Sequence, residues 1–114
     1  MEPTPQFLQG VYPFEGLGLD QPFQLVEVLY AVPAGKLAQP IYFRGGNSST
    51  EMIYCILMRD DKPMRYFPIG AKASIHVPLA VIEDLLGDTC LTIFLAAPKN
   101  TAGSVVLDIG LMEL

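Results

Sequence analysis

Histidine and cysteine are the residues of this chain best suited to nucleophilic or metal chemistry, and there are few of them. His76 is the only histidine, and Cys55 and Cys90 are the only cysteines. One imidazole cannot build a transition-metal site that needs several. A small enzyme that uses a cysteine as nucleophile and His76 as its base remains an alternative. The sequence does not bring these residues together, and we predict no catalytic, cofactor or metal residue.

Both cysteines lie inside apolar runs that resemble strands. In a reducing compartment such cysteines are usually small buried hydrophobic residues and not disulfide partners. We therefore expect Cys55 and Cys90 to be buried and unpaired.

The most polar stretch runs from residue 44 to residue 50. Its successive glycines could fold the backbone into a concave nest of amides, and its hydroxyls could help to hold an anion or a sugar. It lacks the lysine and the spacing of a phosphate-binding P-loop. We predict a turn between strands here, with a ligand-binding loop as the alternative, formed by Arg44, Gly45, Gly46, Asn47 and Ser48.

The carboxylates show no calcium-binding pattern. Glu83, Asp84 and Asp88 lie close together, but the regular spacing of a calcium loop is missing. Asp108 differs because it interrupts an apolar run. If Asp108 faces inward it must be paired with arginine or backbone amides; if it faces outward it shares a mixed surface with Val106 that suits a ligand or a partner.

Tyrosines in the middle of strands could stack on a sugar ring. The candidates are Tyr42, Tyr54 and Tyr66, although most strand aromatics belong to a core or an interface. The chain has no tryptophan, which weakens the carbohydrate hypothesis.

These residues must be positioned by strands. Ten glycines and ten prolines punctuate short runs of β-branched and aromatic residues, which is typical of an all-β antiparallel sandwich. We predict a flexible N-terminus over residues 1–5 and one domain over residues 6–114. At most one short helix is expected, over residues 79–86, with a loop as the alternative. The expected strands, about eight, span residues 6–12, 24–32, 37–44, 51–59, 64–69, 73–77, 89–97 and 104–113.

The strand over residues 51–59 is apolar on both faces. One face carries Ile53, Cys55 and Leu57, and the other carries Met52, Tyr54, Ile56 and Met58. The chain as a whole is 51% hydrophobic and only 17% charged, although a small domain should be more polar than average. We therefore expect self-association through a sheet face, with an interface formed by Met52, Tyr54, Ile56, Met58 and Tyr66.

Charge and hydropathy exclude some partners. The net charge is −5 and the basic residues are scattered, which argues against nucleic acid and against anionic membranes. No apolar run approaches the roughly 20 residues of a membrane-spanning helix. The first residues show no secretory signal, so we expect a cytoplasmic protein.

Two segments resemble parts of galactose-binding-like jelly rolls. Residues 103–113 are similar to the last strand of those domains, with an apolar run interrupted by one aspartate. Residues 36–46 are similar to an early strand and turn. The resemblance implies a two-sheet jelly roll, an architecture that hosts many unrelated functions.

Together these observations favour a non-catalytic cytoplasmic binding or assembly module that forms a homo-oligomer. A carbohydrate or small-ligand-binding module is the alternative, and an enzyme with a Cys/His site is the third reading. The sequence does not decide whether the apolar face binds a second copy or a different protein.

Overall fold

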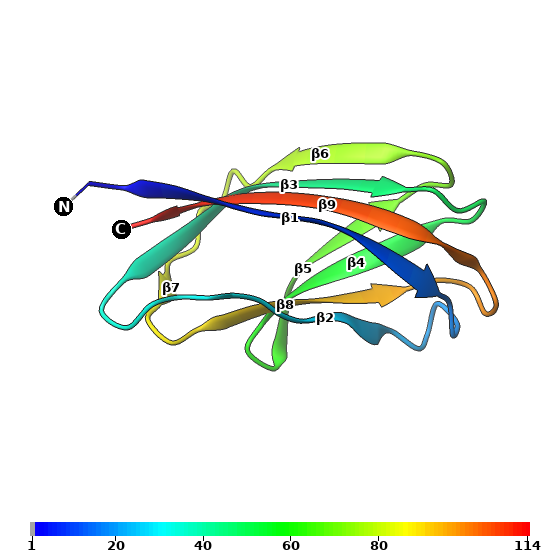
Figure 1. Cartoon of the computed structure of the whole chain (residues 1–114), viewed down its shortest axis with the longest axis horizontal. Helices are drawn as coiled ribbons and strands as arrows, with labels where there is room; N and C mark the ends of the chain where they lie inside the picture. The colour runs from blue at the N-terminus through cyan, green and yellow to red at the C-terminus, as the bar shows by residue number, and fades with distance from the viewer. Residues whose placement is uncertain (1) are drawn as a thin grey trace.

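The computed structural model describes residues 2–114 as two antiparallel sheets packed face to face (Figure 1). Sheet A has the strand order β1-β9-β3-β6, with β7 also paired to β3, and sheet B has the order β2-β8-β4-β5. The all-β sandwich is therefore confirmed. The strands are β1 (Thr4–Glu15), β2 (Phe23–Ala31), β3 (Leu37–Asn47), β4 (Ile53–Arg59), β5 (Lys62–Ile69), β6 (Ser74–Pro78), β7 (Leu85–Leu86), β8 (Cys90–Ala96) and β9 (Ala102–Glu113).

The strands pair as one long hairpin that is rolled into two sheets. β1 pairs with β9, β2 with β8, β3 with β6 and β4 with β5, all antiparallel. Successive strands β1 to β4 alternate between the sheets, and only β4 and β5 form a hairpin within one sheet. This nested pairing is jelly-roll-like. The two ends of the chain lie at the same end of the molecule (Figure 1).

The core lies between the inner faces of the sheets. In β4 the side chains of Ile53, Cys55 and Leu57 are fully buried, as period-two alternation requires for one face of a strand. From sheet A, Phe43 reaches across and stacks on Phe67 of β5, with ring centroids 3.8 Å apart. This aromatic contact joins a central strand of one sheet to the edge strand of the other.

Several strands are longer than the sequence pattern predicts. β1 begins at Thr4, and Thr4 and Pro5 pair with Glu113 and Met112 of β9, so they belong to the sheet and not to a flexible N-terminus. β3 continues to Asn47 instead of ending at Arg44. In both cases a neighbouring strand offers continuous pairing, which outweighs the local preference of proline and glycine for turns.

The described residues form no helix, so the expected option of a helix over residues 79–86 is not realised. This segment is irregular and ends in β7, where Leu85 pairs with Ala38 of β3 and is buried. The Leu79 amide donates to the Ile41 carbonyl at 2.7 Å. Contacts with β3 therefore replace a two-turn helix, which is marginal by itself.

The connection between β4 and β5 is shorter than the four residues, 60–63, that separate the expected strands 51–59 and 64–69. Only Asp60 and Asp61 lie between the strands, and Asp60 adopts a left-handed φ of 54°. The Asp60 carboxylate accepts a hydrogen bond from the Cys90 amide at 3.0 Å. Pro63 sits at an irregularity on the edge strand β5, where its missing N–H costs no ladder bond.

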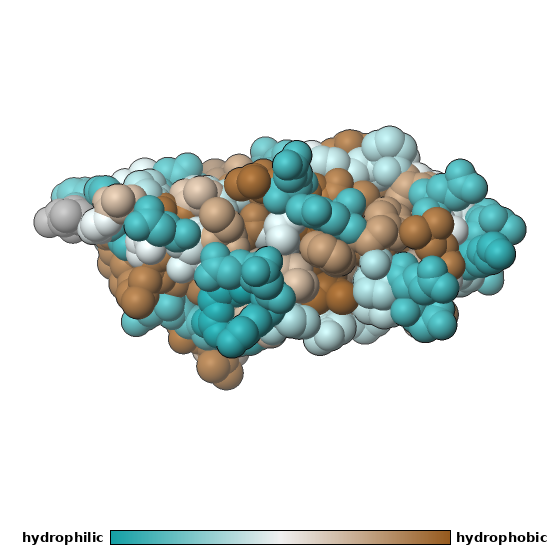
Figure 2. Space-filling model, turned by 90° about the horizontal axis from the view of Figure 1, so that it is seen from below, coloured by the Kyte–Doolittle hydropathy of each residue, from teal (hydrophilic) through white to brown (hydrophobic). Residues whose placement is uncertain are grey.

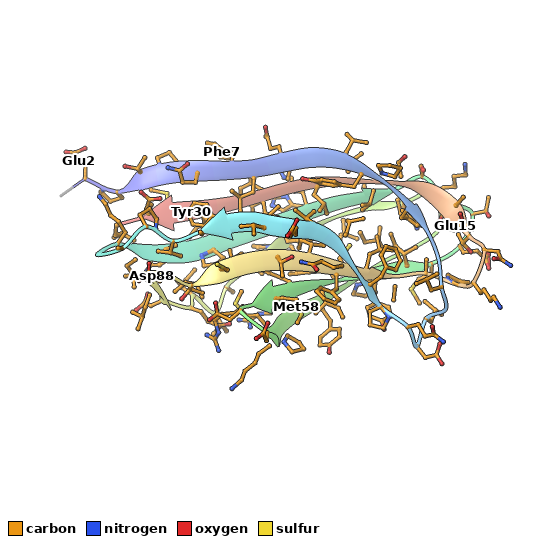
Figure 3. All side chains as sticks on the ribbon, turned by 60° about the horizontal axis from the view of Figure 1, so that its bottom comes forward. Glu2, Phe7, Glu15, Tyr30, Met58 and Asp88 are labelled. Atoms are coloured by element: carbon orange, nitrogen blue, oxygen red, sulfur yellow. The ribbon has the colours of Figure 1, made fainter. Side chains whose placement is uncertain are left out.

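One hydrogen bond between side chains links the sheets near the chain ends. The Tyr30 hydroxyl on β2 donates to the Glu113 carboxylate on β9. Tyr30 lies between strands of the two sheets (Figure 3). Burial, followed by the hydrogen bond to Glu113, raises the pKa of Tyr30 well above its ordinary value, so the neutral, donating form is favoured.

Asn47, at the end of β3, holds two turns together. Its side-chain amide donates to the carbonyls of Glu51, Ile69 and Gly70 at 2.8, 3.3 and 3.1 Å. Its oxygen accepts from the backbone amide and the hydroxyl of Ser49. The side chain is buried, so these bonds satisfy groups that water does not reach freely.

Asn47→Asp should destabilise the fold by about 2 kcal/mol or more, because a carboxyl oxygen would replace the amide that faces three carbonyl oxygens. Urea unfolding with an unchanged m-value measures this loss. Asn100→Asp is the matched control, since Asn100 lies exposed in a turn at a φ of 67° that both residue types tolerate. Equal effects at the two positions would contradict the structural role of Asn47.

Candidate functional site

The outer face of sheet B carries an apolar patch, which we define as Tyr54, Ile56, Met58, Tyr66 and Phe94. Residues directly opposite each other in an antiparallel sheet share a face, and Ile56 lies opposite both Tyr66 and Phe94. Because Ile53, Cys55 and Leu57 fill the core, these side chains face outward. Figure 2, which views the molecule from below, shows hydrophobic groups scattered among hydrophilic ones.

The apolar patch has a covered centre and an exposed rim. Ile56 is only 5% exposed, whereas Tyr66 is 59% exposed. The rings of Tyr54 and Tyr66 lie 6.1 Å apart between centroids, and the Tyr54 hydroxyl donates to the Leu19 carbonyl at 2.7 Å. These contacts restrict the positions of the two tyrosine rings.

The residues predicted for the interface lie on or next to this patch. Tyr54, Ile56, Met58 and Tyr66 belong to it, and the exposed Met52 immediately precedes β4. The sequence analysis did not include Phe94. Alternation along β8 places Phe94 away from the core, but only the register of β8 against β4 brings it beside Ile56.

The outer face of sheet A is different, because a row of polar residues crosses it. Gln9 of β1 lies opposite Asp108 of β9, Asp108 opposite Arg44 of β3, and Arg44 opposite His76 of β6. Tyr42 lies two residues before Arg44 on the same face. We call these five residues the polar row.

Asp108 is the centre of the polar row. Its Oδ1 accepts hydrogen bonds from the Tyr42 hydroxyl at 3.0 Å and from Gln9 Nε2 at 3.3 Å. Its Oδ2 lies 3.8 Å from Arg44 Nη1. Of the two alternatives that the sequence left open, Asp108 therefore faces outward, where it has donors on three sides.

The aromatic ring of Tyr42 organises the cationic side of the row. Arg44 lies over this ring at 5.0 Å from its centroid, and His76 approaches it edge-on at 5.7 Å. Desolvation, followed by the hydrogen bond to Asp108, raises the pKa of Tyr42. Tyr42 is therefore a neutral donor to Asp108 and a platform for Arg44.

A groove of about 630 Å³ opens beside the polar row. This volume is in the range of small-molecule sites. Gly46 leaves room in the floor, since a Cβ there would lie 3.8 Å from that of Val106 and 3.9 Å from that of Ser74. The residues that give the groove its chemistry are Arg44, Ser74, His76, Val106 and Asp108.

The predicted ligand loop is for the most part not a loop. Arg44, Gly45, Gly46 and Asn47 are the last residues of β3, because β9 pairs with all four and β6 pairs with the first three. Arg44 and Gly46 line the groove. The Asn47 side chain is buried and hydrogen-bonded to the neighbouring turns. The Ser48 hydroxyl accepts a hydrogen bond from the Ser104 amide at 2.8 Å.

The structure does not bring cysteine and histidine together. Cys55 faces the core from sheet B, and His76 is exposed on the outer face of sheet A. Burial raises the pKa of the Cys55 thiol to about 12, which disfavours the nucleophilic thiolate. The expectation of burial is wrong for Cys90, which is exposed at the start of β8 because this strand end points its side chain outward.

The predicted acidic cluster is divided among different contacts. Glu83 forms ion pairs with Arg59 and Arg65, and Asp84 accepts a hydrogen bond from Gln39 Nε2 at 2.8 Å. Asp88 lies in a turn at a φ of 71°. Within residues 2–114 no three histidine, cysteine or acidic side chains are grouped as metal ligands would be.

Comparison with known proteins does not assign these surfaces. No protein-family model matches the chain, and no curated protein matches it. Residues 2–114 contain no helix with the length and apolar character needed to cross a membrane.

The two thiols should differ sharply in reactivity. Iodoacetamide should modify Cys90 in the native protein and Cys55 only after unfolding, because Cys55 is fully buried and its pKa is raised. Peptide mass spectrometry over a time course measures both rates. Similar native rates at the two positions would contradict the placement of Cys55 in the core.

Proposed function

We propose that this chain is a non-catalytic binding or assembly module that self-associates through the apolar patch of sheet B. The observation that supports it is the patch itself, in which aromatic and methionine side chains surround the nearly buried Ile56. Aromatic residues and methionine are enriched in the centres of protein interfaces. A rigid sheet holds them in one arrangement, so little side-chain freedom is lost on binding.

A second copy of the chain is the partner we propose. Most soluble homo-oligomers use a self-complementary surface around a two-fold axis. None of the five patch residues is charged, so none of them would repel its own copy across a two-fold contact. The composition supports the same proposal, since 51% hydrophobic residues exceed what a domain of 114 residues usually carries.

A cytoplasmic location is part of this proposal. Both cysteines are free thiols, although one of them is exposed. Proteins of oxidising compartments generally use such residues in disulfides.

Binding of a carbohydrate or another small ligand is the second candidate function. The jelly-roll-like pairing is compatible with a galactose-binding-like domain, which we keep as a proposal. The groove beside the polar row favours ligand binding, because charged and polar side chains converge there on an otherwise apolar surface. The tyrosines Tyr54 and Tyr66 lie on the other sheet, away from this groove.

Tyr66→Glu should separate the oligomer, because it places a charge within the proposed contact. Multi-angle light scattering should give a multiple of 12.5 kDa for the native chain and 12.5 kDa for the variant. The matched control is Phe7→Glu, since Phe7 is also 59% exposed but lies on β1 of sheet A. Figure 3 places Phe7 and Met58 on opposite sides of the molecule.

Two outcomes would contradict self-association through the apolar patch. One is a native mass of 12.5 kDa at every concentration tested. The other is an oligomer that Phe7→Glu separates and Tyr66→Glu leaves intact, which would move the contact to sheet A.

A further inference from the structure

We infer that the groove on sheet A binds a small hydroxylated carboxylate, a molecule with a hydroxyl within two carbons of its carboxylate group. This inference rests on the second candidate function, ligand binding on sheet A, and is independent of self-association through sheet B. It follows from the hydrogen-bonding capacity that the polar row leaves unused.

Arg44 supplies the larger part of that capacity. Its guanidinium carries five N–H donors in a planar fork, and its side chain is 53% exposed. The 3.8 Å contact with Asp108 is longer than the roughly 2.8 Å of a charge-assisted hydrogen bond. The fork therefore retains donors that a carboxylate could engage with two parallel bonds.

Asp108 supplies an acceptor next to this donor. Tyr42 and Gln9 both donate to its Oδ1, whereas its Oδ2 has the long contact with Arg44. A hydroxyl next to the ligand's carboxylate could donate to Oδ2 while the carboxylate binds the guanidinium. One ligand would then satisfy both partners of a loosely formed ion pair.

The arrangement disfavours simpler ligands. Inorganic phosphate carries more negative charge than a carboxylate at neutral pH, so it would be repelled more strongly by Asp108, which lies within a few ångströms of Arg44. A neutral sugar would give Arg44 no opposite charge. The carboxylate and the hydroxyl must occur together to use both side chains.

The remaining walls fit a short carbon skeleton. Val106 offers apolar contact and Ser74 offers a hydroxyl on either side of the space above Gly46. The groove of about 630 Å³ can hold one sugar ring or an acyclic hydroxy acid. Uronic sugars and small hydroxy acids share the required chemistry.

Titration followed by amide NMR shifts tests this inference on the full chain. The probes are glucuronate, glycerate, glucose and inorganic phosphate, each at millimolar concentrations. We expect saturable shifts at β3, β6 and β9 with glucuronate or glycerate, and none with glucose or phosphate. Saturation by glucuronate alone would identify a uronic sugar as the source, and saturation by both would identify the shared carboxylate–hydroxyl pair.

Two variants locate the site. Arg44→Gln should weaken binding about tenfold or more, since a charge-assisted contact is lost. Gly46→Val should abolish binding by filling the groove, because a Cβ at this position meets its neighbours at ordinary contact distance. Lys99→Gln, in an exposed turn, is the control and should bind as the native chain does. Unfolding curves verify that each variant is folded.

The outcomes separate the inference from the function on which it rests. If glucose binds saturably and Arg44→Gln leaves that binding unchanged, the ligand is not a hydroxylated carboxylate. The proposal that the chain is a ligand-binding module would then still be supported. Saturable binding of phosphate would replace the hydroxylated-carboxylate site with a simple anion site. If no probe saturates, the ligand class is overturned and ligand binding on sheet A loses its support. The titration is repeated on the variant Tyr66→Glu, which should be monomeric, so that ligand binding is measured without self-association.

Discussion

The packing of two inner sheet faces against each other is the interaction on which the rest of this molecule depends. β4 and β8, the central strands of sheet B, direct Ile53, Leu57 and Ile93 inward. Phe43 of β3 and Ile109 of β9 point inward from sheet A and pack in the same core. Burial of these side chains supplies the main driving force for folding. It also fixes the register, because a slip by one residue would turn every core side chain outward.

That inward alternation determines what the two outer faces display. On β4, burying Ile53 and Leu57 leaves Tyr54 and Met58 outward, and the sheet adds Tyr66 and Phe94 beside them. On β3, burying Phe43 leaves Tyr42 and Arg44 outward, opposite Asp108 and His76. The outer face of sheet B therefore carries the apolar patch, and the outer face of sheet A carries the polar row among exposed apolar residues such as Val11 and Val106. The proposed contact and the proposed ligand site lie on opposite sheets.

The sequence predicts the fold class well because alternation and turn residues are local. It correctly assigns the two faces of residues 53–58. It misses the polar row, because Gln9, Arg44, His76 and Asp108 come from four strands that only the non-local pairing aligns. It likewise places residues 45–47 in a turn, since the strands that pair with them lie about 30 and 60 residues away in the chain.

Small-angle X-ray scattering of the native chain tests the central claim, that the apolar patch of sheet B is covered by a second copy. A single chain has a Cα radius of gyration of 14.1 Å and extents of 47 × 24 × 22 Å. The account predicts a forward scattering that corresponds to at least two chains, with a clearly larger radius that falls on dilution. Scattering from one chain of 12.5 kDa, unchanged with concentration, would contradict it.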